Sequence, residues 1–248
     1  MDLGISGKRA AVAASSAGLG YGAAAALVAE GVTVAICGRD GAKLADAAAR
    51  LGPNAVAIEA DVSTAAGARG FVEEASARLG GVDILVPNAG GPPPGGFADT
   101  ALEAYGPALE LNLLSTVAMC QAAVPAMRAQ GWGRVVAITS ISVRQPVPGL
   151  ILSNTARAGV TAFLKTLARE VAADGVTVSS VQPGSHDTDR IRALYGGDTA
   201  RAAAGVPVGF LGDAGDFGSV VAFLCSEQAR FVTGAHVPVD GGAYAGLQ

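Results

Sequence analysis

Three polar side chains, Ser140, Ser153 and Arg157, have the types and spacing to do chemistry on an oxygen atom. Ser153 and Arg157 are four residues apart, so on a helix they share one face. Hydroxyl and guanidinium groups donate hydrogen bonds, and such donors stabilise negative charge that develops on a carbonyl oxygen. Ser153 has no visible His and Asp partners in the sequence, which argues against a hydrolytic triad.

A glycine-containing turn, Ala-Ala-Ser-Ser-Ala-Gly-Leu-Gly at residues 13–20, separates the first predicted strand from the first predicted helix. Such a turn lets backbone N–H groups at a helix N-terminus approach a pyrophosphate. The residues expected to contact a dinucleotide here are Ala14, Ser15, Ser16, Gly18, Leu19 and Gly20. Because Ala14 has a Cβ, the turn must stay right-handed there or carry some strain. A glycine-rich turn without a ligand is the alternative.

The end of the second predicted strand, Cys37-Gly38-Arg39-Asp40, bears on which dinucleotide binds. An acid at the position of Gly38 would hydrogen-bond the ribose hydroxyls of NAD, and glycine cannot. The guanidinium of Arg39 could instead bind a 2′-phosphate, so the sequence favours NADP over NAD. The alternative for Arg39 is a solvated surface charge, and Asp40 also fits the N-cap of the following helix.

Further short motifs follow the other predicted strands. They are Asp61-Val62, Pro87-Asn88-Ala89-Gly90, Pro183-Gly184-Ser185-His186-Asp187-Thr188, Val232-Thr233-Gly234 and Val239-Asp240-Gly241-Gly242. Each is weak alone, but all occur in order and at strand ends. With the glycine turn, they resemble the short-chain dehydrogenase/reductase family over the whole chain. The loop at residues 90–95 and the Ser-Asn-x-x-Arg at 153–157 are similar to an atypical subgroup that resembles 3-oxoacyl-acyl-carrier-protein reductases.

The resemblance implies cofactor contacts and an assembly. Asp61 and Val62 would contact the adenine, and Pro183, Gly184 and Thr188 would hold the nicotinamide carboxamide. Asn88, Ala89 and Gly90 match the cofactor-binding motif after the fourth strand. The long predicted helices 101–129 and 152–173 would form the interface of a homodimer or homotetramer.

The resemblance also assigns a catalytic tetrad that this chain alters. In the family a Tyr protonates the substrate oxygen, a Lys lowers the Tyr pKa and binds the nicotinamide ribose, a Ser orients the carbonyl, and an Asn continues a proton relay. Asn112 and Ser140 match by position, whereas Ser153 and Arg157 replace Tyr and Lys. A serine hydroxyl is a weaker acid than a phenol and reaches less far. Arg157 keeps the charge and could bind ribose, but it cannot pass on a proton.

Three functional hypotheses follow. The first, which we favour, is an NADP(H)-dependent oxidoreductase that acts on a small carbonyl or alcohol and takes its proton from water, His186 or Tyr195. For both residues the sequence favours a surface role over proton donation. The second is a dinucleotide-binding pseudo-enzyme or sensor without redox turnover. The third is a non-redox enzyme that reuses the pocket.

The elements that position these residues alternate between short apolar runs and Ala-rich helical stretches. This alternation predicts an α/β fold with a doubly wound parallel seven-stranded sheet of the Rossmann type, in one domain over residues 1–248. The predicted strands are Ala10–Ala14, Thr33–Cys37, Ala55–Glu59, Ile84–Pro87, Arg134–Thr139, Thr177–Gln182 and His236–Val239; the predicted helices are 18–30, 41–51, 64–79, 101–129, 152–173 and 215–226. Loops at 88–98 and from 183 to about 207 follow strand ends, where such sheets bind ligands.

Composition narrows the possible partners. The net charge is −4, and no basic stripe favours nucleic acid. No signal peptide is visible and no run approaches the roughly 20 apolar residues of a membrane helix, so we expect a cytoplasmic protein. Cys37, Cys120 and Cys225 are widely spaced in apolar contexts and should be reduced core thiols. With two histidines and no CxxC, no metal site is expected.

Overall fold

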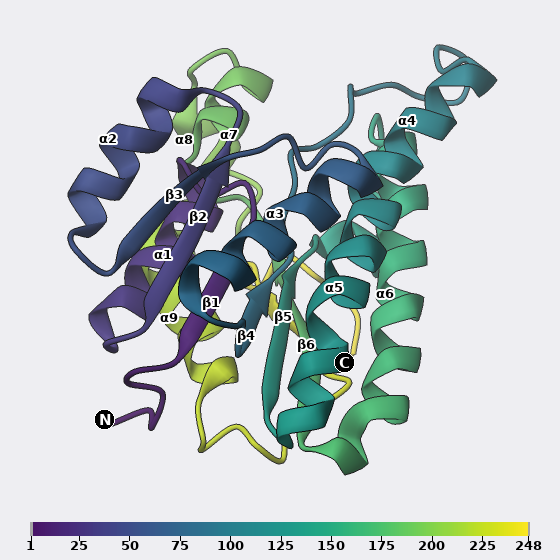
Figure 1. Cartoon of the computed structure of the whole chain (residues 1–248). Coiled ribbons are helices and arrows are strands. Elements are labelled where there is room, and N and C mark those ends of the chain that lie inside the picture. The colour runs from purple at the N-terminus through teal and green to yellow at the C-terminus, as the bar shows by residue number, and fades with distance from the viewer. Residues whose placement is uncertain (1, 248) are drawn as a thin grey trace.

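The computed structural model describes residues 2–247, and its centre is a parallel sheet of seven strands (Figure 1). The strands are β1 (Arg9–Val12), β2 (Thr33–Gly38), β3 (Ala55–Glu59), β4 (Ile84–Val86), β5 (Gly133–Ile138), β6 (Val176–Pro183) and β7 (His236–Val239). Their order in the sheet is β3-β2-β1-β4-β5-β6-β7, which confirms the predicted fold class. The order reverses between β1 and β4, and sheets of this kind bind ligands at that point.

The strands are apolar on both sides because helices cover both faces of the sheet. Along the first strand and the residue after it, Ala11 and Ala13 pack into one core while Ala10 and Val12 pack into the other. This alternation follows from the two-residue period of a strand. The sheet therefore has two hydrophobic cores, one on each face.

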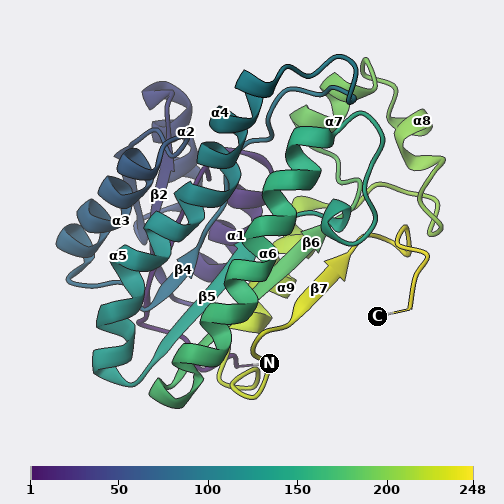
Figure 2. The same cartoon turned by 90° about the vertical axis from the view of Figure 1, so that its right-hand side faces the viewer.

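The helices form two layers around the sheet (Figures 1 and 2). One layer contains α1 (Gly18–Ala29), α2 (Gly41–Leu51) and α9 (Ala214–Cys225), and the other contains α3 (Ala65–Leu79), α5 (Ser115–Gln130) and α6 (Ile151–Val171). Asp40 caps α2 as expected, since its carboxylate accepts hydrogen bonds from the N–H groups of Ala42 and Lys43, both at 3.1 Å.

Several predicted bounds need correction. The first strand ends at Val12 rather than Ala14, because the chain turns at Ala14. The predicted helix 101–129 is a helical run made of η1 (Leu102–Ala104), α4 (Tyr105–Leu109), the π-helical turn η2 (Glu110–Leu114) and α5. Short 3₁₀ turns, η3 (Ile141–Val143) and η4 (Ala172–Asp174), flank α6. Most other ends agree within two residues.

The loop predicted after Pro183 contains two short helices, α7 (Asp189–Leu194) and α8 (Thr199–Ala203). Their N-caps, Thr188 and Asp198, accept hydrogen bonds from backbone N–H groups at 3.5 and 2.9 Å. Helices this short carry too little periodicity to be recognised in a sequence. Both helices, α7 and α8, lie above the carboxyl ends of the strands (Figure 2).

The helical run Leu102–Gln130 is long and apolar enough, by length and composition, to cross a membrane. Half of its apolar window is buried inside the domain, and α5 packs against α3 and the sheet. We therefore interpret it as a core helix.

The three cysteines are free and buried, as predicted. Burial raises the pKa of each thiol to about 12, so none is a thiolate at neutral pH.

Candidate active site

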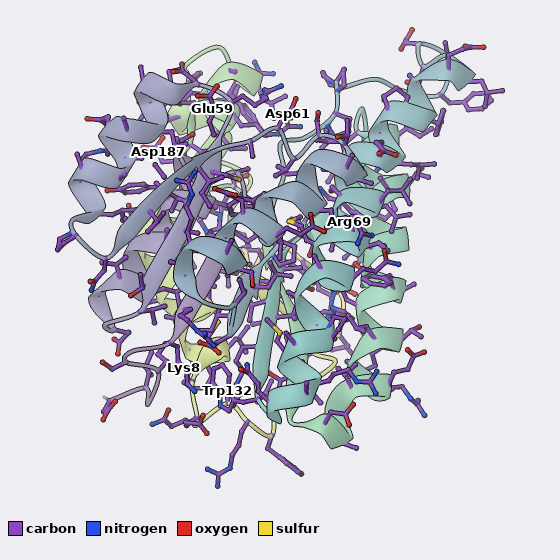
Figure 3. The ribbon with its side chains drawn as sticks, viewed as in Figure 1. Lys8, Glu59, Asp61, Arg69, Trp132 and Asp187 are labelled. Carbon is purple, nitrogen blue, oxygen red and sulfur yellow. The ribbon has the colours of Figure 1, made fainter. Side chains whose placement is uncertain are left out.

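The predicted site residues lie at the carboxyl ends of the strands. Figure 3 shows Asp61 and Asp187 at the same end of the molecule as Glu59, the last residue of β3, whereas Lys8 and Trp132 lie at the opposite end. The short helices α4 and α7 lie at the site end (Figure 1).

The glycine turn is left-handed at an alanine. Ala14 has φ +46°, the only positive φ of a non-glycine residue in the part of the chain that the structure describes. The sequence allowed a right-handed or a strained turn at Ala14, and the structure has the strained one. The Ala14 carbonyl accepts a hydrogen bond from Nδ2 of Asn88 at 3.2 Å, and its N–H points at Sγ of Cys37 at 3.3 Å. Contacts from β2 and the β4 loop therefore hold the turn.

Two glycines allow close approach around this turn. A Cβ on Gly20 would lie 2.5 Å from the Ala14 carbonyl oxygen and 2.9 Å from Nδ2 of Asn88, so only glycine fits. Gly18, with φ +59°, faces Thr188, whose methyl carbon would lie 3.6 Å from an added Cβ. The fold thus brings together Gly18 and Thr188, which are 170 residues apart in the sequence.

The remaining residues of the turn differ in their surroundings. The Ser15 hydroxyl donates to the Val12 carbonyl at 2.6 Å and accepts from the Cys37 N–H at 3.1 Å, so it braces β1 against β2. Ser16 lies beside the end of β2, since a Cβ on Gly38 would be 3.0 Å from its hydroxyl oxygen. Leu19 packs against the core of the α1 face.

Arg39 and Asp61 are exposed at the ends of β2 and β3. A hydrogen bond of 2.9 Å from the Ser63 N–H, helped by the charge of Arg39, holds the pKa of Asp61 below its usual value. Val62 is buried in the core. Arg39 and Asp61 are therefore near each other and accessible.

Asn112 lies in the π-helical turn η2 and is buried. Its Nδ2 donates to the Gly90 carbonyl at 2.8 Å, whereas its buried Oδ1 has no partner. A buried oxygen of this kind calls for a water or a ligand. π-Helical turns are frequent at functional sites.

Arg157 binds backbone carbonyls at the ends of two strands. Nη1 donates to the carbonyls of Ile138 and Thr139 at 3.2 and 3.0 Å, and Nη2 reaches the Ala89 carbonyl at 3.5 Å. Burial, together with the nearby charge of Arg190, lowers the pKa of Arg157 to about 10, so the guanidinium stays charged at neutral pH. The ribose contact suggested by its position therefore competes with these carbonyls.

The two serines lie on the elements that flank Arg157. Ser140 is half-buried, and its hydroxyl accepts a hydrogen bond from the Ser142 N–H at 3.1 Å. Ser153 is buried on α6, one helical turn before Arg157. Because α6 begins at Ile151, Ser153 lies inside the helix and does not cap it.

His186 and Tyr195 were the two candidate proton donors. The His186 ring is buried, packs edge-on against Phe217 at 5.1 Å and touches Gly212, and burial lowers its pKa. The ring is therefore packed into the loop after β6 and is neutral at neutral pH. Tyr195 is half-buried just after α7.

The sequence reasoning missed Arg190. Its Nη1 donates a long hydrogen bond of 3.4 Å to the Gly91 carbonyl, and a Cβ on Gly91 would overlap its guanidinium. The glycine at 91 is the local signal that another group approaches closely at this point. The residue that approaches, 99 positions later, could not be read from the sequence.

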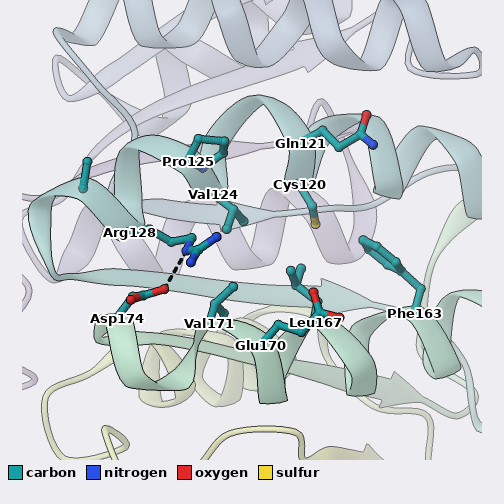
Figure 4. A pocket seen from close by; sticks show the side chains of 11 residues that line it. Cys120, Gln121, Val124, Pro125, Arg128, Phe163, Leu167, Glu170, Val171 and Asp174 are labelled. Atoms are coloured by element: carbon teal, nitrogen blue, oxygen red, sulfur yellow. Dashed lines mark hydrogen bonds and ion pairs between the residues drawn. The ribbon is translucent and has the colours of Figure 1, made fainter.

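Two cavities lie away from these residues. One, of about 520 Å³, lies between α5 and α6 and is lined by residues such as Cys120, Phe163 and Leu167 (Figure 4). The other, of about 660 Å³, lies beside Trp132. No candidate site residue lines either one, so neither is the catalytic site. In residues 2–247, no three His, Cys, Asp or Glu side chains come together as metal ligands.

Comparison with known proteins gives the family. A family model described as enoyl-(acyl carrier protein) reductase matches residues 13–244. The 3-oxoacyl-[acyl-carrier-protein] reductase FabG of Salmonella typhimurium is 36% identical over 96% of this chain and 98% of its own length. The chain belongs to the short-chain dehydrogenase/reductase family. Its described relatives include oxidoreductases such as FabG.

Two solved structures of the short-chain dehydrogenase/reductase family are informative. L-sorbose reductase from Gluconobacter frateurii, complexed with NADPH and L-sorbose, has a TM-score of 0.94 and 31% identity, with 100% of both chains covered. A short chain oxidoreductase from Pseudomonas aeruginosa PAO1 with bound NADPH has a TM-score of 0.89 and 30% identity, covering 97% of this chain and 98% of its own. That protein contains an atypical catalytic center.

Proposed function

We propose that this protein is an NADP(H)-dependent carbonyl reductase or alcohol dehydrogenase, similar to 3-oxoacyl-acyl-carrier-protein reductases, for a small carbonyl or alcohol substrate. The observation that carries the proposal is the convergence of Asn112 and Arg157 on residues 89–90, at the same sheet edge as the glycine turn. The solved relatives with NADPH support the choice of cofactor.

The residues present fit a dinucleotide. The missing side chain of Gly20 leaves the N-terminus of α1 close to the turn, where backbone N–H groups can bind a pyrophosphate. Arg39 would bind the 2′-phosphate and Asp61 and Val62 the adenine. The nicotinamide end would lie against Asn88, Ala89, Gly90, Pro183, Gly184 and Thr188. When bound, the nicotinamide would supply or accept a hydride.

The chain's own residues would stabilise the substrate oxygen and its proton. The Ser140 hydroxyl would donate a hydrogen bond to that oxygen, and the charge of Arg157 would stabilise the alkoxide that develops. A water held by the free Oδ1 of Asn112 and by Ser153 would relay a proton from solvent to that oxygen, since the short side chain of Ser153 does not reach as far as a tyrosine. The positive charge of Arg157 would lower the energy of the alkoxide and so speed hydride transfer in either direction.

The first test separates enzyme from binding protein. NADPH and NADH binding are measured by cofactor fluorescence, and turnover is then measured against ketones and 3-oxoacyl thioesters. We expect NADPH binding and slow reduction of some panel members. Tight binding without any turnover would favour the pseudo-enzyme, in which Arg157 only joins strand ends. Failure to bind either dinucleotide would contradict the proposed function.

The second test concerns Arg39→Ala. Loss of the guanidinium should weaken NADPH binding by about tenfold or more while leaving NADH binding nearly unchanged, because only NADPH carries the 2′-phosphate. Arg69→Ala, on α3 and hydrogen-bonded to Gln121, is the control and should change neither affinity. An equal effect of Arg39→Ala on both cofactors would remove the case for phosphate recognition.

The third test restores the family's acid and base. The double variant Ser153→Tyr with Arg157→Lys should raise the turnover number, because a phenol beside an ammonium group has the reach and the acidity that serine lacks. Arg157→Lys alone should not raise it. A silent double variant, folded by circular dichroism, would show that the pocket has diverged beyond the acid.

We also propose that the protein is a cytoplasmic, single-domain homodimer or homotetramer assembled through α5 and α6. The cavity between these helices leaves Phe163 and Leu167 only partly packed (Figure 4). Light scattering during gel filtration should give a mass of two or four chains. Phe163→Asp should reduce that mass, and a monomeric unaltered protein would contradict the assembly.

A further inference from the structure

The backbone segment at residues 89–91 is contacted from three separate elements. Asn112 of η2 donates to one carbonyl at 2.8 Å, Arg157 of α6 reaches another at 3.5 Å, and Arg190 of α7 reaches a third at 3.4 Å. Arg190 therefore lies beside the candidate catalytic residues. It is exposed, so most of its five N–H donors remain free for a ligand.

The two arginines at this segment have no carboxylate partner. Among residues 2–247, six ion pairs form, and neither Arg157 nor Arg190 takes part in them. Asp187, three residues before Arg190, accepts hydrogen bonds from Arg192 instead, at 2.8 and 2.9 Å. Burial lowers the pKa of Arg157, and the positive charge of Arg190 lowers it further because the two guanidinium groups repel each other. Arg157 and Arg190 thus place two positive charges near each other, and neither is bound to a carboxylate of the described residues.

A bound anion would relieve this repulsion. The planar guanidinium matches a carboxylate, which it can bind with two parallel hydrogen bonds. Arg190 lies against the segment after β4 that Asn112 and Arg157 also contact, while the turn that would hold the cofactor pyrophosphate follows β1. The glycine turn also adjoins this segment, through Asn88 and Ala14. We assign Arg190 to the substrate because it contacts the same segment as Asn112 and Arg157, and the test below separates this from binding of the cofactor phosphates.

We propose that Arg190 binds a carboxylate of the substrate, so that the enzyme selects oxo acids or hydroxy acids over neutral ketones and alcohols. This inference rests on the proposed oxidoreductase function and names its substrate class. Gly91 is needed for this position of Arg190, because a side chain at residue 91 would displace the guanidinium.

The test compares an acid with its ester. Acetoacetate and methyl acetoacetate are titrated calorimetrically into protein saturated with NADP⁺, a combination in which no hydride is available for reduction. The unaltered protein should bind acetoacetate about tenfold more tightly or better. Arg190→Leu should bring the ratio close to one, and Arg190→Lys should keep part of it. Arg201→Leu, on α8, is the control and should leave the ratio unchanged.

The outcomes separate this inference from the proposed function. If NADP⁺ does not bind, the proposed function fails. If NADP⁺ binds but the acid and the ester bind equally well, or the preference survives in Arg190→Leu, the carboxylate inference is overturned while the function stands. A loss of NADP⁺ affinity in Arg190→Leu, without a change in the ratio, would assign Arg190 to the cofactor phosphates and also overturn it.

Discussion

Arg157 shows how one altered residue can change the role of a position. A lysine has a single nitrogen, whereas two nitrogens of the Arg157 guanidinium bind three backbone carbonyls at the ends of β4 and β5. The side chain therefore joins two strands at the sheet edge and places a fixed charge there. In the proposed reaction, catalysis would depend on that charge and on a proton from another source.

Ala14 is the second informative residue. A left-handed alanine costs about 1–2 kcal/mol, and glycine avoids this cost but loses about 0.5–1 kcal/mol in chain entropy. We therefore expect Ala14→Gly to raise the melting temperature by about 2 °C, measured by calorimetry. Ala17→Gly is the matched control, because Ala17 has φ −160° and gains nothing from glycine. A lower melting temperature for Ala14→Gly than for Ala17→Gly would show that the turn is not strained.

At the scale of elements, α1 and α9 pack backbone to backbone. A Cβ on Gly22 would overlap the Ala214 carbonyl, and one on Gly218 would overlap the Gly22 carbonyl. This close contact sets the position of α1, whose N-terminus forms the glycine turn. The two glycines therefore support the candidate cofactor site from a distance.

Gly22→Ala should destabilise the protein by about 2 kcal/mol or more, since backbone atoms cannot move aside as a side chain can. Gly70→Ala is the matched change in α3, where a Cβ meets nothing within 4 Å, and it should stabilise the helix by up to about 1 kcal/mol. Urea unfolding followed by circular dichroism measures both. Equal effects of the two substitutions would contradict the close packing of α1 on α9.

At the scale of the whole molecule, the buried His186 and the half-buried His236 couple stability to pH. Burial lowers the pKa of His186 and of His236, and the charges of Lys165 and Arg144 lower that of His236 further. The unfolded chain takes up protons near pH 6.5, whereas the folded chain resists them to a lower pH. The contribution of these histidines to the free energy of unfolding is therefore fully present above about pH 6.5 and is lost as the pH falls below that value.

We expect the free energy of unfolding in urea to be smaller at pH 5.5 than at pH 7.5. His236→Asn, which can keep a hydrogen bond to Ser180, should reduce this difference because one of the two imidazoles with a lowered pKa is gone. An unchanged pH dependence in that variant would contradict the contribution of His236. Asp83, whose pKa is held low by Arg9 against the effect of burial, acts only in more acidic solution.

The sequence by itself determined the seven-stranded parallel sheet, the cofactor motifs at its strand ends and the replacement of the catalytic Tyr and Lys. These features are local: periodicity and short motifs report on neighbouring residues. Only the tertiary structure decided that Ala14 is left-handed, that His186 is packed away and that Arg157 and Arg190 meet the segment after β4. Those contacts join residues far apart in the chain, so they depend on how the layers pack, which no local pattern encodes.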